Sequence, residues 1–208
     1  MLITPAPPVA CAAAFSAQAP AFLSGATGIS QQNYLGTAPF IPSPAQLGPG
    51  VPVAQQVFLL SLKAAAYNTG VINPPANGWR FLAGNASAPI LGRVVQIPPA
   101  QTWKLTGVFF GLRVSDALMA TQPLSSLPEV ANNDYELRVL AVPGLNLEAF
   151  WLAAQNAGSP DLIVPFPAGP EQPIPALRAQ NPYKMVTFLA LIRPLAGGLL
   201  TMAAGYGA

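Results

Sequence analysis

The sequence contains no histidine and very little charge. Of its 208 residues, 9 are Lys or Arg and 7 are Asp or Glu, so 8% of the chain is charged, against about 25% in a typical globular domain. Without histidine, neither a Ser-His-Asp nor a Cys-His catalytic arrangement can form, and zinc or iron sites with histidine ligands are also excluded. These absences exclude most familiar hydrolases, and we predict that the protein is not an enzyme.

Cysteine occurs once, at Cys11, so no disulfide can form within the chain. This cysteine lies among alanines without a basic neighbour, which favours an inert, packed thiol over a nucleophile. The residues before it lack a basic leader and include Pro7 and Pro8, so we expect no signal peptide. The sequence does not assign a compartment; a virion or another assembled particle follows only if the structural interpretation given below holds.

The few carboxylates offer two kinds of site, a glycosidase-like pair or a calcium loop. They are Asp116, Glu129, Asp134, Glu136, Glu148, Asp161 and Glu171. A catalytic pair needs two carboxyls facing each other across a cleft, which nothing in their spacing indicates. The densest group, around Asn132-Asn133-Asp134, lacks the alternating acidic positions and the glycine of an EF-hand and favours a turn. We therefore predict no catalytic residue, no metal site and no cofactor.

The basic residues argue against nucleic acid as a partner. The net charge is only +2, and the Lys and Arg residues are spread singly from Lys63 to Arg193, whereas nucleic-acid binding needs them clustered. The most apolar stretch, residues 185–208, contains Arg193 and Pro194 near its middle and four glycines after them. This favours packing against protein, and we predict no membrane span.

The first 62 residues contain no charged side chain, and proline recurs through them every few positions. Proline removes backbone donors and glycine costs backbone entropy, so neither a long helix nor a central strand is expected here. We predict a long extended arm over residues 1–52. Large apolar side chains punctuate it at Phe15, Phe22, Tyr34, Phe40 and Ile41. Such spacing is typical of a ribbon laid along a surface, either of its own domain or of a neighbouring subunit.

Short apolar runs bounded by turn residues follow the arm. They cover residues 56–62, 79–83, 90–97, 102–114, 135–142, 145–152, 162–166 and 183–192. The pattern predicts a mainly β domain, an antiparallel sandwich or barrel of which a jelly roll is one version, with α+β as the alternative. One or two short helices are expected. Residues 115–121 are one candidate; for residues 182–193, both helix and strand stay open. We divide the chain into the arm (1–52), a β-rich domain (53–198) and a C-terminal tail (199–208).

Residues 134–152 predict a β-hairpin with Pro143 and Gly144 in its loop. One face carries Tyr135, Leu137, Val139, Phe150 and Leu152, with Glu148 nearer the turn; the other carries Glu136, Arg138, Leu140, Leu147 and Trp151. The second face is half polar and contains a large aromatic side chain. Such faces are common where a sheet meets another subunit, although the arm of the same chain could cover it equally well.

A surface with so little charge and 52% hydrophobic residues overall needs to be covered. Our leading hypothesis is a structural subunit of a homo- or hetero-oligomer, such as a capsid component of a virus or phage, or a filament. The residues expected at its contacts are Phe15, Phe22, Tyr34, Phe40, Ile41 and Trp151. The alternative is a β-sandwich or barrel that binds an apolar ligand. On the leading hypothesis, deleting residues 1–49 should leave a folded domain of lower oligomeric mass.

Overall fold

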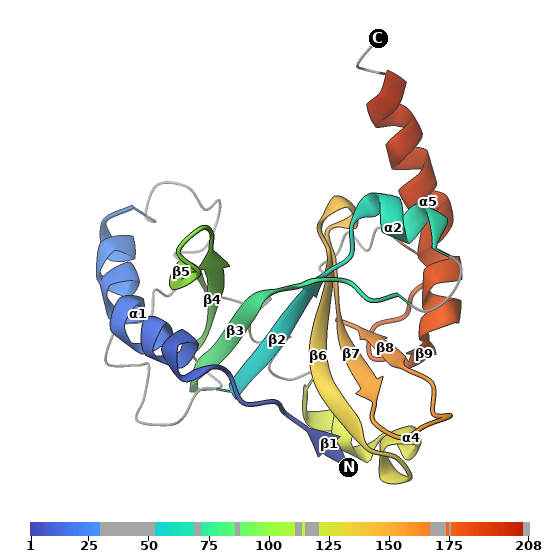
Figure 1. Cartoon of the computed structure of the whole chain (residues 1–208), viewed down its shortest axis with the longest axis horizontal. Helices are drawn as coiled ribbons and strands as arrows, with labels where there is room; N and C mark the ends of the chain where they lie inside the picture. Colours follow the sequence, from blue (N-terminus) through green and yellow to red (C-terminus); the bar gives the residue numbers. More distant parts are fainter. Residues whose placement is uncertain are drawn as a thin grey trace. The chain divides into compact units, whose positions relative to one another are not determined.

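The computed structural model describes residues 1–29, 53–68, 72–85, 88–110, 114, 121–166, 174 and 176–205. The described strands form a mixed, open, nine-stranded sheet in the order β5-β4-β3-β2-β6-β7-β8-β9, with β1 parallel to β6 (Figure 1). The predicted mainly β class is confirmed. The predicted sandwich or barrel is not confirmed, because helices, rather than a second sheet, cover the strands in the described part of the chain.

The elements lie in the following order along the chain. They are β1 (Leu2–Ile3), α1 (Val9–Ile29), β2 (Val53–Leu59), α2 (Leu62–Tyr67), β3 (Ala76–Asn85), β4 (Ala88–Ile97), β5 (Thr102–Phe110), η2 (Gln122–Ser126), α4 (Pro128–Ala131), β6 (Tyr135–Val142), η3 (Pro143–Leu145), β7 (Leu147–Ala154), β8 (Leu162–Pro165), β9 (Tyr183–Lys184) and α5 (Met185–Gly205). Of the predicted helix at 115–121, residues 115–120 lie outside the described residues.

The chain divides into two compact units, which we call unit 1 and unit 2. Unit 1 comprises Met1–Thr4, Val57–Ala76 and Pro123–Ala208, and unit 2 comprises Pro5–Gln56 and Asn77–Gln122. The three-part division predicted from the sequence, with boundaries after residues 52 and 198, stays a prediction.

Unit 2 packs helix α1 against strands β3, β4 and β5. Cys11, Phe15, Ala19 and Leu23, spaced four residues apart, form the buried side of the helix. The Phe15 ring stacks on Phe81 of β3 at a centroid distance of 4.8 Å. Gly92 of β4 makes room for this ring, because a Cβ there would lie 2.3 Å from a Phe15 ring carbon. The Gln18 side chain also accepts a hydrogen bond of 3.0 Å from the Leu105 amide of β5.

The extended arm predicted for residues 1–52 is wrong over residues 9–29, where the chain forms α1. Two physical reasons outweigh the proline content. Alanine, the best helix former, is the commonest residue in the helix, and the prolines at 7 and 8 precede its start, where no amide donor is needed. Pro20 lies inside the helix, and the buried stripe at four-residue spacing offsets the hydrogen bond that it removes. Tyr34, Phe40 and Ile41 lie outside the described residues.

The β6–β7 hairpin of unit 1 confirms the hairpin predicted at 134–152. The strands pair in antiparallel register with Leu137 opposite Leu152 and Arg138 opposite Trp151, so the two predicted faces are correct. The connection is wider than a two-residue turn: η3 is followed by Asn146 in the left-handed region, with a φ of 49°. Asparagine tolerates this conformation better than most residues, which explains its place after Pro-Gly.

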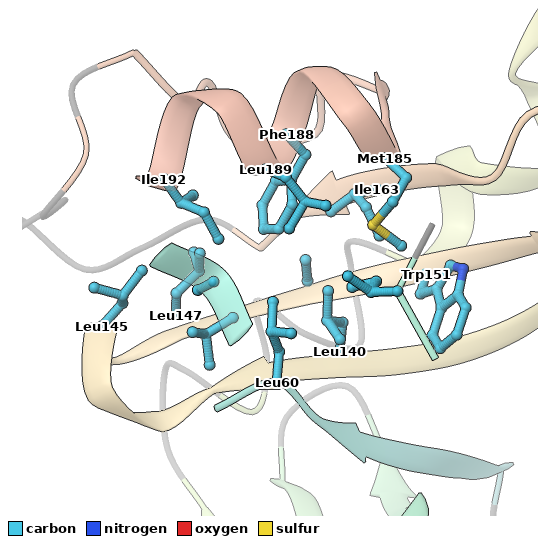
Figure 2. Close-up of a cluster of buried hydrophobic side chains, with 14 of the residues drawn as sticks. Leu60, Leu140, Leu145, Leu147, Trp151, Ile163, Met185, Phe188, Leu189 and Ile192 are labelled. Carbon is cyan, nitrogen blue, oxygen red and sulfur yellow. The ribbon is translucent and has the colours of Figure 1, made fainter. Parts of the chain in front are cut away.

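Helix α5 covers one face of the unit 1 strands. Residues 182–193 had left helix and strand open, and the structure shows a two-residue strand, β9, followed by the helix from Met185. Figure 2 shows Phe188, Leu189 and Ile192 of α5 pointing toward the side chains of the hairpin. The same cluster includes Leu60 and the short helix α2, whose Ser61 side chain accepts a hydrogen bond from the Ala64 amide as an N-cap.

Candidate interaction surfaces

The residues predicted to make subunit contacts are not brought together by the structure. Phe15 and Trp151 are 4% and 3% exposed and lie in the cores of unit 2 and unit 1, respectively. Phe22, on the outer side of α1, is 40% exposed. Of the three predicted contact residues that the structure describes, Phe22 alone presents a substantial area to solvent. Its role in a contact stays a prediction.

The polar groups on the half-polar face of the hairpin find their partners within unit 1. The Arg138 guanidinium lies over the rings of Phe58 and Trp151, 5.1 and 4.8 Å from their centroids, and its Nε donates to Glu136 at 2.7 Å. The indole Nε1 of Trp151 donates to the Asp161 carboxylate at 2.8 Å. Cation–π and charge-assisted contacts hold this face together without help from another subunit.

Unit 2 exposes large apolar side chains and few charges. Those exposed are Val9, Phe22, Val53, Ile97 and Phe109, the last being 52% exposed. The charged side chains in the described part of unit 2 are Arg80, which is buried, Arg93 and Lys104. No carboxylate occurs in that described part, so the surface offers little charge to keep it in water.

Unit 1 ends in a projecting, uncharged stretch of helix, residues 197–205, which we call the α5 end. Among the α5 residues whose burial the structure describes, Ala196 is the last that is buried. Leu199 and Leu200 still pack against the unit 1 cluster, and the final turns extend away from the unit 1 strands in Figure 1. Met202 is 64% exposed there, and the only side-chain hydroxyl, Thr201, donates to the Gly197 carbonyl at 3.0 Å. By length and composition alone, residues 185–203 could cross a membrane, and 28% of that window is buried within the protein.

A groove of about 480 Å³ opens on unit 1 beside helix α2, and we call it the α2 groove. It is lined by residues 59–62, 64, 68, 72–75, 143 and 144. None of these residues is charged; the polar side chains among them are Ser61, Asn68 and Asn73. Arg193 of α5 donates to the Asn68 carbonyl at 2.9 Å, which ties α2 to the helix at the base of the α5 end.

The Asn132-Asn133-Asp134 turn before β6 is held by hydrogen bonds within the chain. The side-chain amides of Asn132 and Asn133 donate to the carbonyls of Pro128 and Glu129, which closes helix α4. The Asp134 carboxylate accepts from the ammonium group of Met1 at 3.0 Å. Among the residues that the structure describes, no three His, Cys, Asp or Glu side chains lie close enough to hold a metal ion.

Burial raises the pKa of the Cys11 thiol to about 12, from 9.0. A raised pKa keeps the reactive thiolate scarce, so at pH 8 we expect alkylation of Cys11 by iodoacetamide to be on the order of a thousandfold slower in the native protein than in the unfolded chain. Mass spectrometry of samples quenched over time measures both rates. Because the pKa of Cys11 is higher in the folded protein than in the unfolded chain, Cys11 stabilises the fold below pH 9, and this contribution is lost as the pH rises toward 12. Rapid native alkylation at pH 8 would contradict the buried position.

Two features of these surfaces were missed in the sequence. The first is α2: the apolar run at 56–62 predicts a strand that includes Leu62, the first residue of the helix, whereas the Ser61 N-cap followed by Lys63 and three alanines signals the helix. The second is the α5 end, which the absence of any charge after Arg193 signalled. The α2 groove has no local signal, because its walls come from separate parts of the chain.

Comparison with known proteins gives no family for this chain: no protein-family model matches it, and no curated protein or solved structure shows significant similarity. Its function is therefore inferred from the exposed apolar side chains of unit 2 and from the composition of the chain.

Proposed function

We propose that this chain is a non-enzymatic structural subunit of an oligomeric assembly, such as a virus or phage particle or a filament. The observation that carries the proposal is the surface of unit 2, where exposed apolar side chains occur with few charges among the described residues. Obligate subunit interfaces have this character, since they resemble a protein core cut in half.

The whole composition supports the same proposal. With 8% charged residues, the chain lacks the charged exterior that keeps a monomer of this size soluble and free of self-association. Phe22 and Phe109 are large aromatic side chains that remain exposed in the single chain. Burying a fully exposed phenylalanine contributes about 1.5–3 kcal/mol, and burying the exposed half of each of these rings in a contact would recover roughly half of that. The proposed partners are copies of this chain or other structural proteins.

The proposal predicts that the full chain forms a defined oligomer and that Phe109→Glu lowers its mass. A charge at this position would have to be desolvated in the contact, which costs several kcal/mol. Light scattering on a sizing column, over a concentration series and with negative-stain images of large species, measures the mass. Because Phe109 is 52% exposed in the chain alone, the variant should keep its fold, which circular dichroism checks.

The matched control is Ala157→Glu, which adds the same charge at an exposed position in the turn between β7 and β8 of unit 1. We expect this control to assemble like the unmodified chain. A monomer near 21.5 kDa at every concentration would refute self-assembly. An oligomer of undiminished mass for Phe109→Glu would show that β5 lies outside the contact.

A further inference from the structure

We propose that one face of the unit 2 sheet binds a carboxylate-bearing segment of a partner protein. This face, which we call the β4–β5 face, lies opposite helix α1 and is formed by Arg93, Val95 and Ile97 of β4 and by Lys104 and Phe109 of β5. The inference rests on the proposed function and deepens it, since it states the chemistry of the partner at the contact of unit 2.

The register of β4 and β5 gathers these side chains on one face. Val95 lies directly opposite Lys104, and directly opposite residues of an antiparallel pair share a face. Arg93 is two positions from Val95 on the same strand, so its side chain also lies on this face. Val94 and Leu105, each one position along, point the other way and are buried in the cluster under α1. The β4–β5 face is therefore the side of the strands that the helix does not cover.

The β4–β5 face carries positive charge alone among the described residues of unit 2. Lys104 is exposed and Arg93 is half-buried, and neither forms an ion pair with a described residue. Arg80 of β3 lies directly opposite Arg93 and adds a third, buried cation to the same face. Like charges directly opposite each other destabilise a sheet, so a carboxylate beside Arg93 would offset their repulsion. The basic residues that are spread singly in the sequence thus meet on one surface.

The Phe109 ring supplies the apolar part of this surface. It is 52% exposed and lies over Gly107, where a Cβ would be 3.2 Å from two of its ring carbons. Gly107 is the residue opposite Arg93, so no side chain at this position separates the ring from the arginine. Ile97, which is 38% exposed, adds an aliphatic side chain on the same face. Aromatic side chains and arginine are the groups that most often carry the binding energy of protein contacts.

A protein segment fits this face better than a nucleic acid or a lipid surface does. Nucleic-acid affinity comes from several neutralised phosphates, whereas the face offers two accessible cations, Arg93 and Lys104, among the described residues. Anionic membranes are recognised by clusters of roughly four to eight basic residues. A protein contact needs fewer, because apolar burial supplies affinity while the charges select and orient the partner. The same face of a second copy would bring like charges together, which excludes it as the partner.

The binding of two labelled peptides tests the inference. One is a short fluorescein-labelled peptide of glutamate and leucine, and the other carries glutamine in place of every glutamate. Fluorescence anisotropy with the full chain measures both affinities. At low ionic strength we expect the glutamate peptide to bind on the order of tenfold more tightly. Added salt should remove this advantage, because it screens exposed charges.

Lys104→Glu should weaken the binding of the glutamate peptide about tenfold and leave that of the glutamine peptide unchanged. The matched control is Lys63→Glu, which makes the same change of charge at an exposed position on α2 of unit 1 and should bind like the unmodified chain. Both lysines are exposed, so both variants should keep the fold, which circular dichroism checks. Phe109→Ala should weaken the binding of both peptides, because it removes apolar area without changing the charge.

The outcomes separate this inference from the proposed function. An oligomer whose mass falls with Phe109→Glu, but which does not prefer the glutamate peptide, would overturn the inference and leave the structural subunit standing. Equal weakening by Lys104→Glu and Lys63→Glu would also overturn it, because net charge rather than the face would govern binding. A chain that stays monomeric but binds the glutamate peptide through Lys104 would refute self-assembly and support the inference, with a different protein as the partner.

Two further probes distinguish the other anionic partners. One is single-stranded oligothymidylate, and the other is flotation with vesicles of phosphatidylcholine and phosphatidylglycerol. Binding to either that is tighter than to the glutamate peptide, and that is lost in Lys104→Glu but not in Lys63→Glu, would assign the face to nucleic acid or to lipid and overturn the inference. We expect neither probe to bind more tightly than the peptide.

Discussion

Replacing Phe15 by alanine is expected to lower the free energy of unfolding by about 3–5 kcal/mol, the cost of removing a buried phenylalanine and leaving a cavity. The Phe15 ring is 4% exposed, stacks on Phe81 at 4.8 Å and fills the space above Gly92. It therefore anchors α1 on the strands of unit 2. Urea denaturation followed by circular dichroism measures the loss, and hydrogen exchange of the β3–β5 amides locates it in unit 2.

Phe22→Ala is the matched control for this prediction, because it makes the same truncation on the same helix. Phe22 is 40% exposed, so we expect a loss well below that of Phe15→Ala. Both variants are compared at one protein concentration, since assembly itself adds to apparent stability. Equal losses would show that α1 does not use the stripe of Cys11, Phe15, Ala19 and Leu23 as its packing face.

The role of α1 reverses an expectation drawn from the sequence. An extended arm used only between subunits could be deleted without harm to its own domain. In the structure, removal of residues 1–49 exposes the side chains that α1 covers, which include Trp79, Phe81 and Leu105. We now expect the truncated chain to lose the packing of unit 2, rather than to become a folded domain of lower mass.

The sequence predicted features that depend on local patterns. Strand β6 was placed at residues 135–142 and is found there, because alternation at period two and a Pro-Gly loop are both local signals. Helix α1 also had a local signal, its alanine content and four-residue stripe, but the number of prolines was given more weight. The covering of the half-polar hairpin face was not predictable, because Phe58 and Arg138 meet from distant parts of the chain.

The candidate site was predicted only in outline. Composition predicts a partner, which stays a prediction, and the residues expected at its contacts include Phe15 and Trp151, which are buried in their own units. Large aromatic side chains satisfy a core and an interface by the same physics, so the sequence could not distinguish the two. The α2 groove required the fold itself, since residues near 60, 74 and 143 form its walls together.

Replacing Phe188 by alanine is the counterpart in unit 1, with an expected loss of about 3–5 kcal/mol in the free energy of unfolding. The Phe188 side chain is fully buried and points from α5 into the cluster formed with the hairpin and Leu60 (Figure 2). The loss of this contact should loosen α5 and also weaken the support of α2, which packs in the same cluster. Urea denaturation measures the stability, and hydrogen exchange of the β6–β7 amides locates the loss in unit 1.

Val186→Ala is the control on the same helix. Val186 is 57% exposed, and alanine favours a helix over valine, so the free energy of unfolding should change by less than about 0.5 kcal/mol. Equal losses for Phe188→Ala and Val186→Ala would show that Phe188 does not anchor α5 in the unit 1 cluster.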